Sequence, residues 1–157
     1  MSLDYIFSFC NVLALIGWLA LALAPVGRAY IINFARGIAL VLAIGYVLQF
    51  FLVTEPVEGG SFTTLAGVAA LFSLPGNVML GWSHYLAFDL FIGSWQVEDS
   101  DRMRVPHWLV IPCLALTFML GPIGLLLYFF ARSAARVTRG PQKDSAPWIN
   151  PSSEPLT

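Results

Sequence analysis

Long apolar stretches constrain the fold of this chain more than any other feature of its sequence. Four such stretches occur, and each carries at most one formally charged residue. The hydrocarbon core of a bilayer is about 30 Å thick, so a helix needs about 20 mostly apolar residues to cross it. We therefore predict an all-α integral membrane bundle of four transmembrane helices, with spans at residues 5–24, 30–53, 77–97 and 107–131.

The composition excludes a water-soluble globule. Of the 157 residues, 58% are hydrophobic and only 11% are charged, whereas soluble domains carry about 25% charged residues. Lipid must therefore cover most of the surface of the folded chain. The net charge of −1 gives no reason to expect a nucleic-acid partner.

The segments outside the spans differ in character. Residues 62–74 are apolar but too few to cross a bilayer, so we predict a short re-entrant or interfacial segment before the third span. Residues 1–131 form the predicted transmembrane domain. Residues 132–157 are polar and rich in proline, and we predict that they form a disordered tail.

The orientation in the membrane follows from the basic residues near the span ends. Four spans place both termini on one side. Residues 1–24 are neither arginine-rich nor serine-rich, unlike a plastid transit peptide. The two sides carry equal numbers of basic residues. The clustered C-terminal set favours cytoplasmic termini. We therefore expect a bacterial inner membrane protein with both termini cytoplasmic. One side holds Arg132, Arg136, Arg139 and Lys143, and the other holds Arg28, Arg36, Arg102 and Arg104.

The third predicted span contains an ionisable residue, Asp89, near its middle. Such a residue costs about 2.5–3.5 kcal/mol on insertion scales, so it should face a partner or a cavity. By helical spacing, Trp82 and Tyr85 share the face of Asp89, whereas His84 lies about 140° away and shares its face with Asn77. Asp89 and His84 are either functional groups or structural contacts between helices.

Two further residues lie within the predicted spans. Arg36 either pairs with Asp89, which lies at a similar depth, or extends its side chain to the headgroups. Pro122 lacks an N–H, so it frees the carbonyl of Phe118 deep in the fourth span. The resulting kink either widens a pocket beside His84 or only assists helix packing.

A metal site is not expected. Glu98, Asp99 and Asp101 precede His107, and carboxylates with imidazole are a known ligand set. However, the chain has only two histidines, and they do not form a metal-binding pair. A solvated interfacial loop is the better interpretation, and we predict neither a metal nor another cofactor.

A distinctive string of residues lies in the third and fourth spans. Residues 81–90 read Gly-Trp-Ser-His-Tyr-Leu-Ala-Phe-Asp-Leu, Pro106 and His107 follow, then Pro112 and Cys113, and residues 121–128 read Gly-Pro-Ile-Gly-Leu-Leu-Leu-Tyr. This pattern resembles the family of the plant abscisic-acid-deficient-four protein. The resemblance is close over residues 62–131 and looser over the first two spans.

This resemblance implies four membrane helices and a role in the metabolism of xanthophylls or other carotenoids. The plant reaction forms neoxanthin from violaxanthin: an epoxide opens while a neighbouring proton leaves. Such an isomerisation needs a general acid at the epoxide oxygen and a general base at the carbon. The expected acid–base residues are His84 and Asp89, with Tyr85 and His107 as further candidates, and the expected substrate-binding residues are Trp82, Asn77, Arg36 and Pro122.

Three functions therefore remain open. The first is an isomerase that acts on a carotenoid through acid–base residues within the bilayer. The second is a carotenoid cleavage oxygenase, with a metal held by histidine and carboxylates. The third is a non-enzymatic carotenoid-binding or scaffolding subunit that assists other membrane enzymes. In each case the expected partners are the lipid bilayer and a carotenoid or another polyene lipid.

Overall fold

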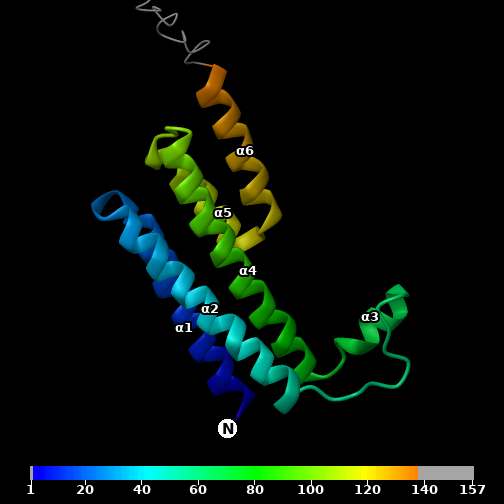
Figure 1. Ribbon diagram of the computed structural model, residues 1–157. Helices are drawn as coiled ribbons and strands as arrows, with labels where there is room; N and C mark the ends of the chain where they lie inside the picture. The colour runs from blue at the N-terminus through cyan, green and yellow to red at the C-terminus, as the bar shows by residue number, and fades with distance from the viewer. Residues whose placement is uncertain (1, 138–157) are drawn as a thin grey trace, which may run out of the picture.

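Three long helices lie side by side and form most of the protein (Figure 1). The computed structural model describes residues 2–137, and all of the regular elements within that range are helical. The long helices are α1 (Leu3–Ala22), α2 (Arg28–Leu52) and α4 (Pro75–Arg102). The shorter elements are the one-turn 3-10 helix η1 (Ala24–Val26), α3 (Leu65–Leu71), α5 (His107–Leu120) and α6 (Pro122–Val137).

The predicted short segment before the third span forms α3, which has only seven residues. The Thr64 hydroxyl caps α3 by accepting a hydrogen bond from the Gly67 amide at 3.0 Å. Pro75 then begins α4, where its missing N–H removes no helical hydrogen bond. The axes of α3 and α4 differ by 101°, so α3 projects away from the three long helices (Figure 1).

The predicted fourth span is divided into two helices. α5 ends at Leu120, Gly121 adopts a positive φ of 45°, and Pro122 begins α6. The two helices contain 14 and 16 residues, or about 21 and 24 Å at 1.5 Å per residue. Neither helix matches the bilayer core, which is about 30 Å thick.

α5 and α6 instead form a hairpin that enters and leaves the bundle at the same end (Figure 1). Its tip, Gly121, lies beside Asp89 in the middle of α4, and Arg132 has returned to Asp99 near the end of α4. Gly124 permits the close approach, because a Cβ there would lie 2.1 Å from the backbone nitrogen of Thr117. We call this unit the α5–α6 hairpin.

The structure supports two or three of the four predicted spans. α1 and α2 are each long and apolar enough to cross a membrane, and α4 supplies a third span if the bent pair α3–α4 counts as one. The all-helical membrane class stands, but a bundle of four spans is not established. Two boundaries also shift, because residues 98–102 continue α4 and residues 132–137 continue α6. The remainder of the predicted tail, residues 138–157, lies outside the described residues.

Small residues and buried polar pairs join the helices. Ala35 and Ala39 on α2 are buried, and such small side chains let membrane helices approach closely. The buried Ser83 hydroxyl on α4 donates to the side-chain oxygen of Gln49 on α2 at 3.0 Å. These contacts hold α2 against α4, and the face between them carries the site described below.

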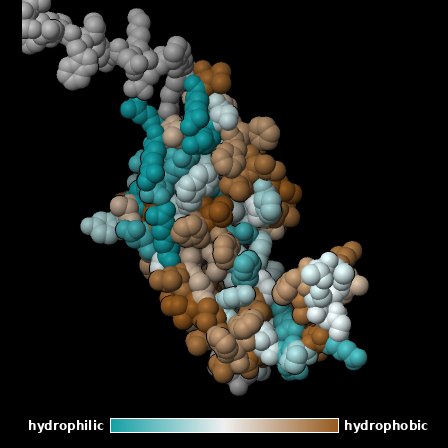
Figure 2. Space-filling view, turned by 45° about the vertical axis from the view of Figure 1, so that its right-hand side comes forward, coloured by the Kyte–Doolittle hydropathy of each residue, from teal (hydrophilic) through white to brown (hydrophobic). Residues whose placement is uncertain are grey.

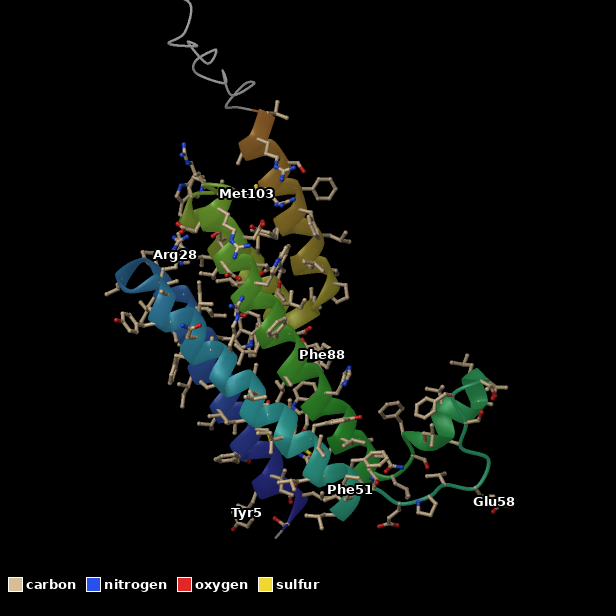
Figure 3. All side chains as sticks on the ribbon, in the orientation of Figure 1. Tyr5, Arg28, Phe51, Glu58, Phe88 and Met103 are labelled. Atoms are coloured by element: carbon tan, nitrogen blue, oxygen red, sulfur yellow. The ribbon has the colours of Figure 1, made fainter. Side chains whose placement is uncertain are left out.

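The charges of the described residues are separated between the two ends of the bundle. Leu3 lies at the end formed by Leu52 and Pro75, whereas Arg136 at the end of α6 bonds the sulfur of Met103 (Figure 3). The structure therefore does not support the expectation that both termini share a side. The end near Met103 holds all of the arginines in residues 2–137, namely Arg28, Arg36, Arg102, Arg104, Arg132 and Arg136. The other end holds the acidic residues Asp4, Glu55 and Glu58.

We predict that the arginine-rich end faces the cytoplasm and that the N-terminus lies on the opposite side, because basic residues near span ends are retained on the cytoplasmic side. Reporter fusions at Gly59 and Gly76 should report the non-cytoplasmic side, and a fusion at Gly140 the cytoplasmic side. A common side for all three positions would restore the four-span arrangement.

The α5–α6 hairpin is fastened to α4 by a buried group of three polar side chains. Asp99 accepts hydrogen bonds from the Tyr128 hydroxyl at 2.7 Å and from Arg132 Nε at 2.7 Å. Tyr128 is fully buried, and Asp99 is 8% exposed. Because Asp99 lies on α4 and both donors lie on α6, these bonds hold the open end of the hairpin in place.

Tyr128→Phe should destabilise the protein by about 1.5–3 kcal/mol, the usual cost of removing a hydrogen bond to a charged group. Thermal unfolding in detergent would measure the loss. Tyr30→Phe is the matched control, because the Tyr30 side chain is 86% exposed. Equal stability of the two variants would show that the contact with Asp99 does not hold the hairpin.

Candidate functional site

The face between α2 and α4 carries three cavities in a row, with volumes of about 560, 330 and 440 Å³. Tyr46 and His84 line the first cavity, Ala43 and Ala87 line the second, and Arg36 lines both the second and the third. The lining residues recur every three or four positions on both helices, so they follow one face of each helix. We call this row of cavities the α2–α4 groove.

The largest cavity of the groove contains His84. Its walls include four aromatic side chains, among them Phe50, Phe62 and Phe72, the last two from the segment that contains α3. The exposed His84 ring stacks on Phe88 with centroids 4.5 Å apart. The segment that contains α3 therefore forms one wall of the groove near His84.

Asn77 shapes the rim of the same cavity. Its amide nitrogen donates to the backbone carbonyls of Leu71 at 2.9 Å and Glu55 at 3.2 Å, and its oxygen accepts from the Glu55 amide at 3.3 Å. These bonds connect the end of α2 to the start of α4. The predicted sharing of one helix face by Asn77 and His84 is thus observed, and Glu55 is a second titratable residue of this cavity that the sequence reasoning missed.

Asp89 lies on another face of α4, against the tip of the α5–α6 hairpin. The Tyr85 hydroxyl donates to the carbonyl of Phe118 at 2.7 Å, which is the carbonyl that Pro122 leaves without a helical partner. Tyr85 lies one turn before Asp89 on the same face of α4. One of its oxygens, Oδ2, is buried and has no hydrogen-bond partner among the described residues.

Of the two alternatives for Arg36, the pair with Asp89 does not form. Arg36 instead donates from Nη2 to Glu98 and from Nε to the Ser94 hydroxyl, the latter at 3.2 Å. The reason is the length of α4, which continues past the predicted end of the span and brings Glu98 opposite Arg36. Arg36 therefore lies between the second and third cavities of the groove, away from His84.

The remaining predicted site residues are dispersed. Trp82 stacks on Tyr85 with centroids 5.3 Å apart, and its Nε1 donates to the side-chain oxygen of Asn11 at 3.2 Å. Pro122 lies at the hairpin tip beside Asp89 and not beside His84. A ring nitrogen of His107 lies 3.0 Å from the carbonyl oxygen of Ala22. His107 is the first residue of α5, so the length of that helix, about 21 Å, separates it from Asp89.

The acidic residues near the end of α4 do not form the solvated loop that the sequence predicted. Glu98, Asp99 and Asp101 lie on the last turns of α4 and pair with arginines. Within residues 2–137, no group of three or more His, Cys, Asp or Glu side chains is placed to hold a metal ion.

The bundle, the α5–α6 hairpin and the groove define a helical membrane protein with a long, largely apolar cavity row between two of its helices. The chain belongs to the ABA DEFICIENT 4-like family, whose model matches residues 5–128. This membership confirms the resemblance seen in the sequence and relates the protein to carotenoid metabolism and neoxanthin. No curated protein and no solved structure matches the chain.

Proposed function

We propose that the protein binds a carotenoid along the first two cavities of the α2–α4 groove and isomerises its end group beside His84. The observation that carries this proposal is an exposed histidine that lines a cavity of about 560 Å³ together with four aromatic side chains, and this cavity is followed by an apolar one. Cavities for small ligands are typically apolar and carry a few polar groups that orient the ligand. The family relationship supplies the substrate class.

The dimensions of the groove support an extended ligand. The lining of its first two cavities on α2 runs from Phe50 to Arg36, or about 21 Å at 1.5 Å per residue. The middle of the groove is lined by Ala39, Ala43 and Ala87, whose small side chains leave room for a narrow chain. A rigid polyene suits this shape, because binding it orders few rotatable bonds.

His84 can carry the proton transfer that the isomerisation requires. The reaction breaks one epoxide C–O bond, the oxygen gains a proton and a carbon nearby loses one, so atoms and oxidation level balance. His84 acts as a general acid or base at the end group, and Glu55 is the second titratable group of the same cavity. Histidine suits both roles, because its ordinary pKa is near neutral.

Asp89 acts as a positioning residue in this proposal. It lies outside the cavity, on the face of α4 that meets the hairpin tip, and is five positions from His84 in the sequence. Tyr85 and Pro122 support the hairpin tip against which Asp89 lies. Of the four catalytic candidates expected from the sequence, the proposal therefore keeps only His84 as the catalytic residue. Asp89 is a positioning residue.

His84→Gln should abolish pigment conversion and leave pigment binding intact, because Gln keeps hydrogen-bonding capacity but cannot exchange the proton. The assay is expression in carotenoid-producing cells, with extracted pigments separated and compared with those of cells that carry the vector alone. His107→Gln is the matched control and should retain conversion. Conversion by His84→Gln would contradict the assignment, and a wild-type protein that binds pigment without converting it would indicate a binding or scaffolding subunit.

Ala43→Trp should prevent carotenoid binding, because an indole would fill the cavity of about 330 Å³ in the middle of the groove. Absorbance of pigment that copurifies with the protein measures the effect. Ala20→Trp on α1, which does not line the groove, is the control for insertion and folding. Undiminished pigment in purified Ala43→Trp would place the ligand elsewhere.

A further inference from the structure

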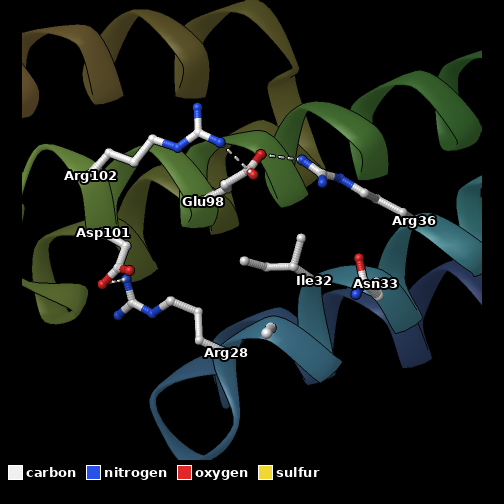
Figure 4. Close-up of a pocket in the computed structure, with 8 residues that line it drawn as sticks. Arg28, Ile32, Asn33, Arg36, Glu98, Asp101 and Arg102 are labelled. Carbon is white, nitrogen blue, oxygen red and sulfur yellow. Dashed lines mark hydrogen bonds and ion pairs between the residues drawn. The ribbon is translucent and has the colours of Figure 1, made fainter.

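The arginine-rich end of the bundle contains a cleft of about 440 Å³ between the start of α2 and the end of α4 (Figure 4). This cleft is the third cavity of the α2–α4 groove and lies beyond Arg36. Its lining differs from that of the other two cavities, because charged side chains replace aromatic and apolar ones. Figure 2 shows hydrophilic side chains gathered on the upper part of this side of the molecule, above a hydrophobic lower part. The residues that line the cleft are Arg28, Ala29, Ile32, Asn33, Arg36, Glu98, Asp101 and Arg102.

The charges around the cleft do not cancel. Arg36 and Arg102 both bond Glu98, and Arg28 bonds Asp101 at 3.0 Å. Three guanidinium groups thus face two carboxylates, which leaves one positive charge in excess. A ligand with a single negative charge would neutralise the cleft, and a cation would not.

Hydrogen-bond donors remain for such a ligand. Arg28 uses Nη1 on Asp101, and Arg102 uses Nη2 on Glu98, whereas each guanidinium carries five N–H donors. Arg28 is also the first residue of α2, and the preceding Gly27 provides no side-chain cap. The first amides of a helix lack helical partners, and the helix dipole favours an anion there.

The position of the cleft identifies the source of the anion. It lies at the end of a membrane bundle that collects every arginine of residues 2–137, and basic residues near span ends lie close to the headgroups. On the next face of α2, Tyr30 is 86% exposed and offers contacts to an acyl chain. We propose that the cleft binds the phosphodiester headgroup of an anionic membrane lipid, whose chains lie against this face of α2.

This lipid site is tested on the purified full-length protein in detergent, by its melting temperature during titration with lipid. Phosphatidylglycerol, a monoanionic phosphodiester, should raise the melting temperature more than zwitterionic phosphatidylcholine does. Inorganic phosphate at equal concentration should have a smaller effect, because it has no acyl chains. A shift from phosphatidylcholine as large as that from phosphatidylglycerol would overturn the proposal, and an equal shift from phosphate would assign the cleft to a soluble anion.

Variants distinguish lipid binding in the cleft from a general attraction of anionic lipid to the arginine-rich end. Arg28→Gln and Arg102→Gln should each weaken the apparent affinity for phosphatidylglycerol about tenfold, as expected for a lost charge-assisted hydrogen bond. Arg136→Gln removes the same charge outside the cleft, where Arg136 bonds Met103, and should leave the affinity unchanged. The Arg102 side chain is 70% exposed, so this variant remains informative if Arg28→Gln fails to fold. Equal weakening by all three variants would overturn the proposal.

Discussion

A chain that reverses direction inside a bilayer must find partners for the backbone groups at the reversal, because the hydrocarbon core contains no water to bind them. This constraint governs the α5–α6 hairpin. The Tyr85 hydroxyl satisfies the carbonyl of Phe118, and the Gly121 amide donates to the carbonyl of Thr117 at 2.9 Å. Gly124 then lets α6 pack closely on α5. The turn is possible in mid-bundle because α4 presents a hydroxyl at the same depth.

The hairpin in turn determines the distribution of charge. Because α6 returns to the end at which α5 began, Arg132 meets Asp99, and Arg136 lies beside Met103. A continuous fourth span would have carried both arginines to the opposite end. The observed arrangement separates an arginine-rich end from an end that holds only acidic charges among the described residues. It also explains the burial of Asp99, which is compensated by two hydrogen-bond donors from α6.

Helix α4 divides the protein into two environments. One of its faces, with His84, meets α2 and the groove, and another, with Asp89, meets the tip of the hairpin. The two residues are five positions apart, so a helix places them about 140° from each other and they cannot both line one cavity. The groove and the contact with the hairpin tip therefore lie on different faces of α4.

The sequence alone determined the membrane class, the helical content and the family. These follow from local properties, namely apolar run length, composition and the residue string at positions 81–90. It also determined which residues share a helix face, such as His84 with Asn77, because the helical period depends only on spacing. The short segment before α4 was predictable for the same reason, since its length is visible directly.

Only the tertiary structure decided the reversal at Gly121 and its consequences. A glycine and a proline in an apolar run are compatible with a kinked span or with a turn, and the partners on α4 select the turn. The same holds for Arg36, which pairs with Glu98 because α4 extends to it, and for Asp99, which is buried because α6 lies over it. A side chain's partner depends on where other helices lie, and that information is absent from its local sequence.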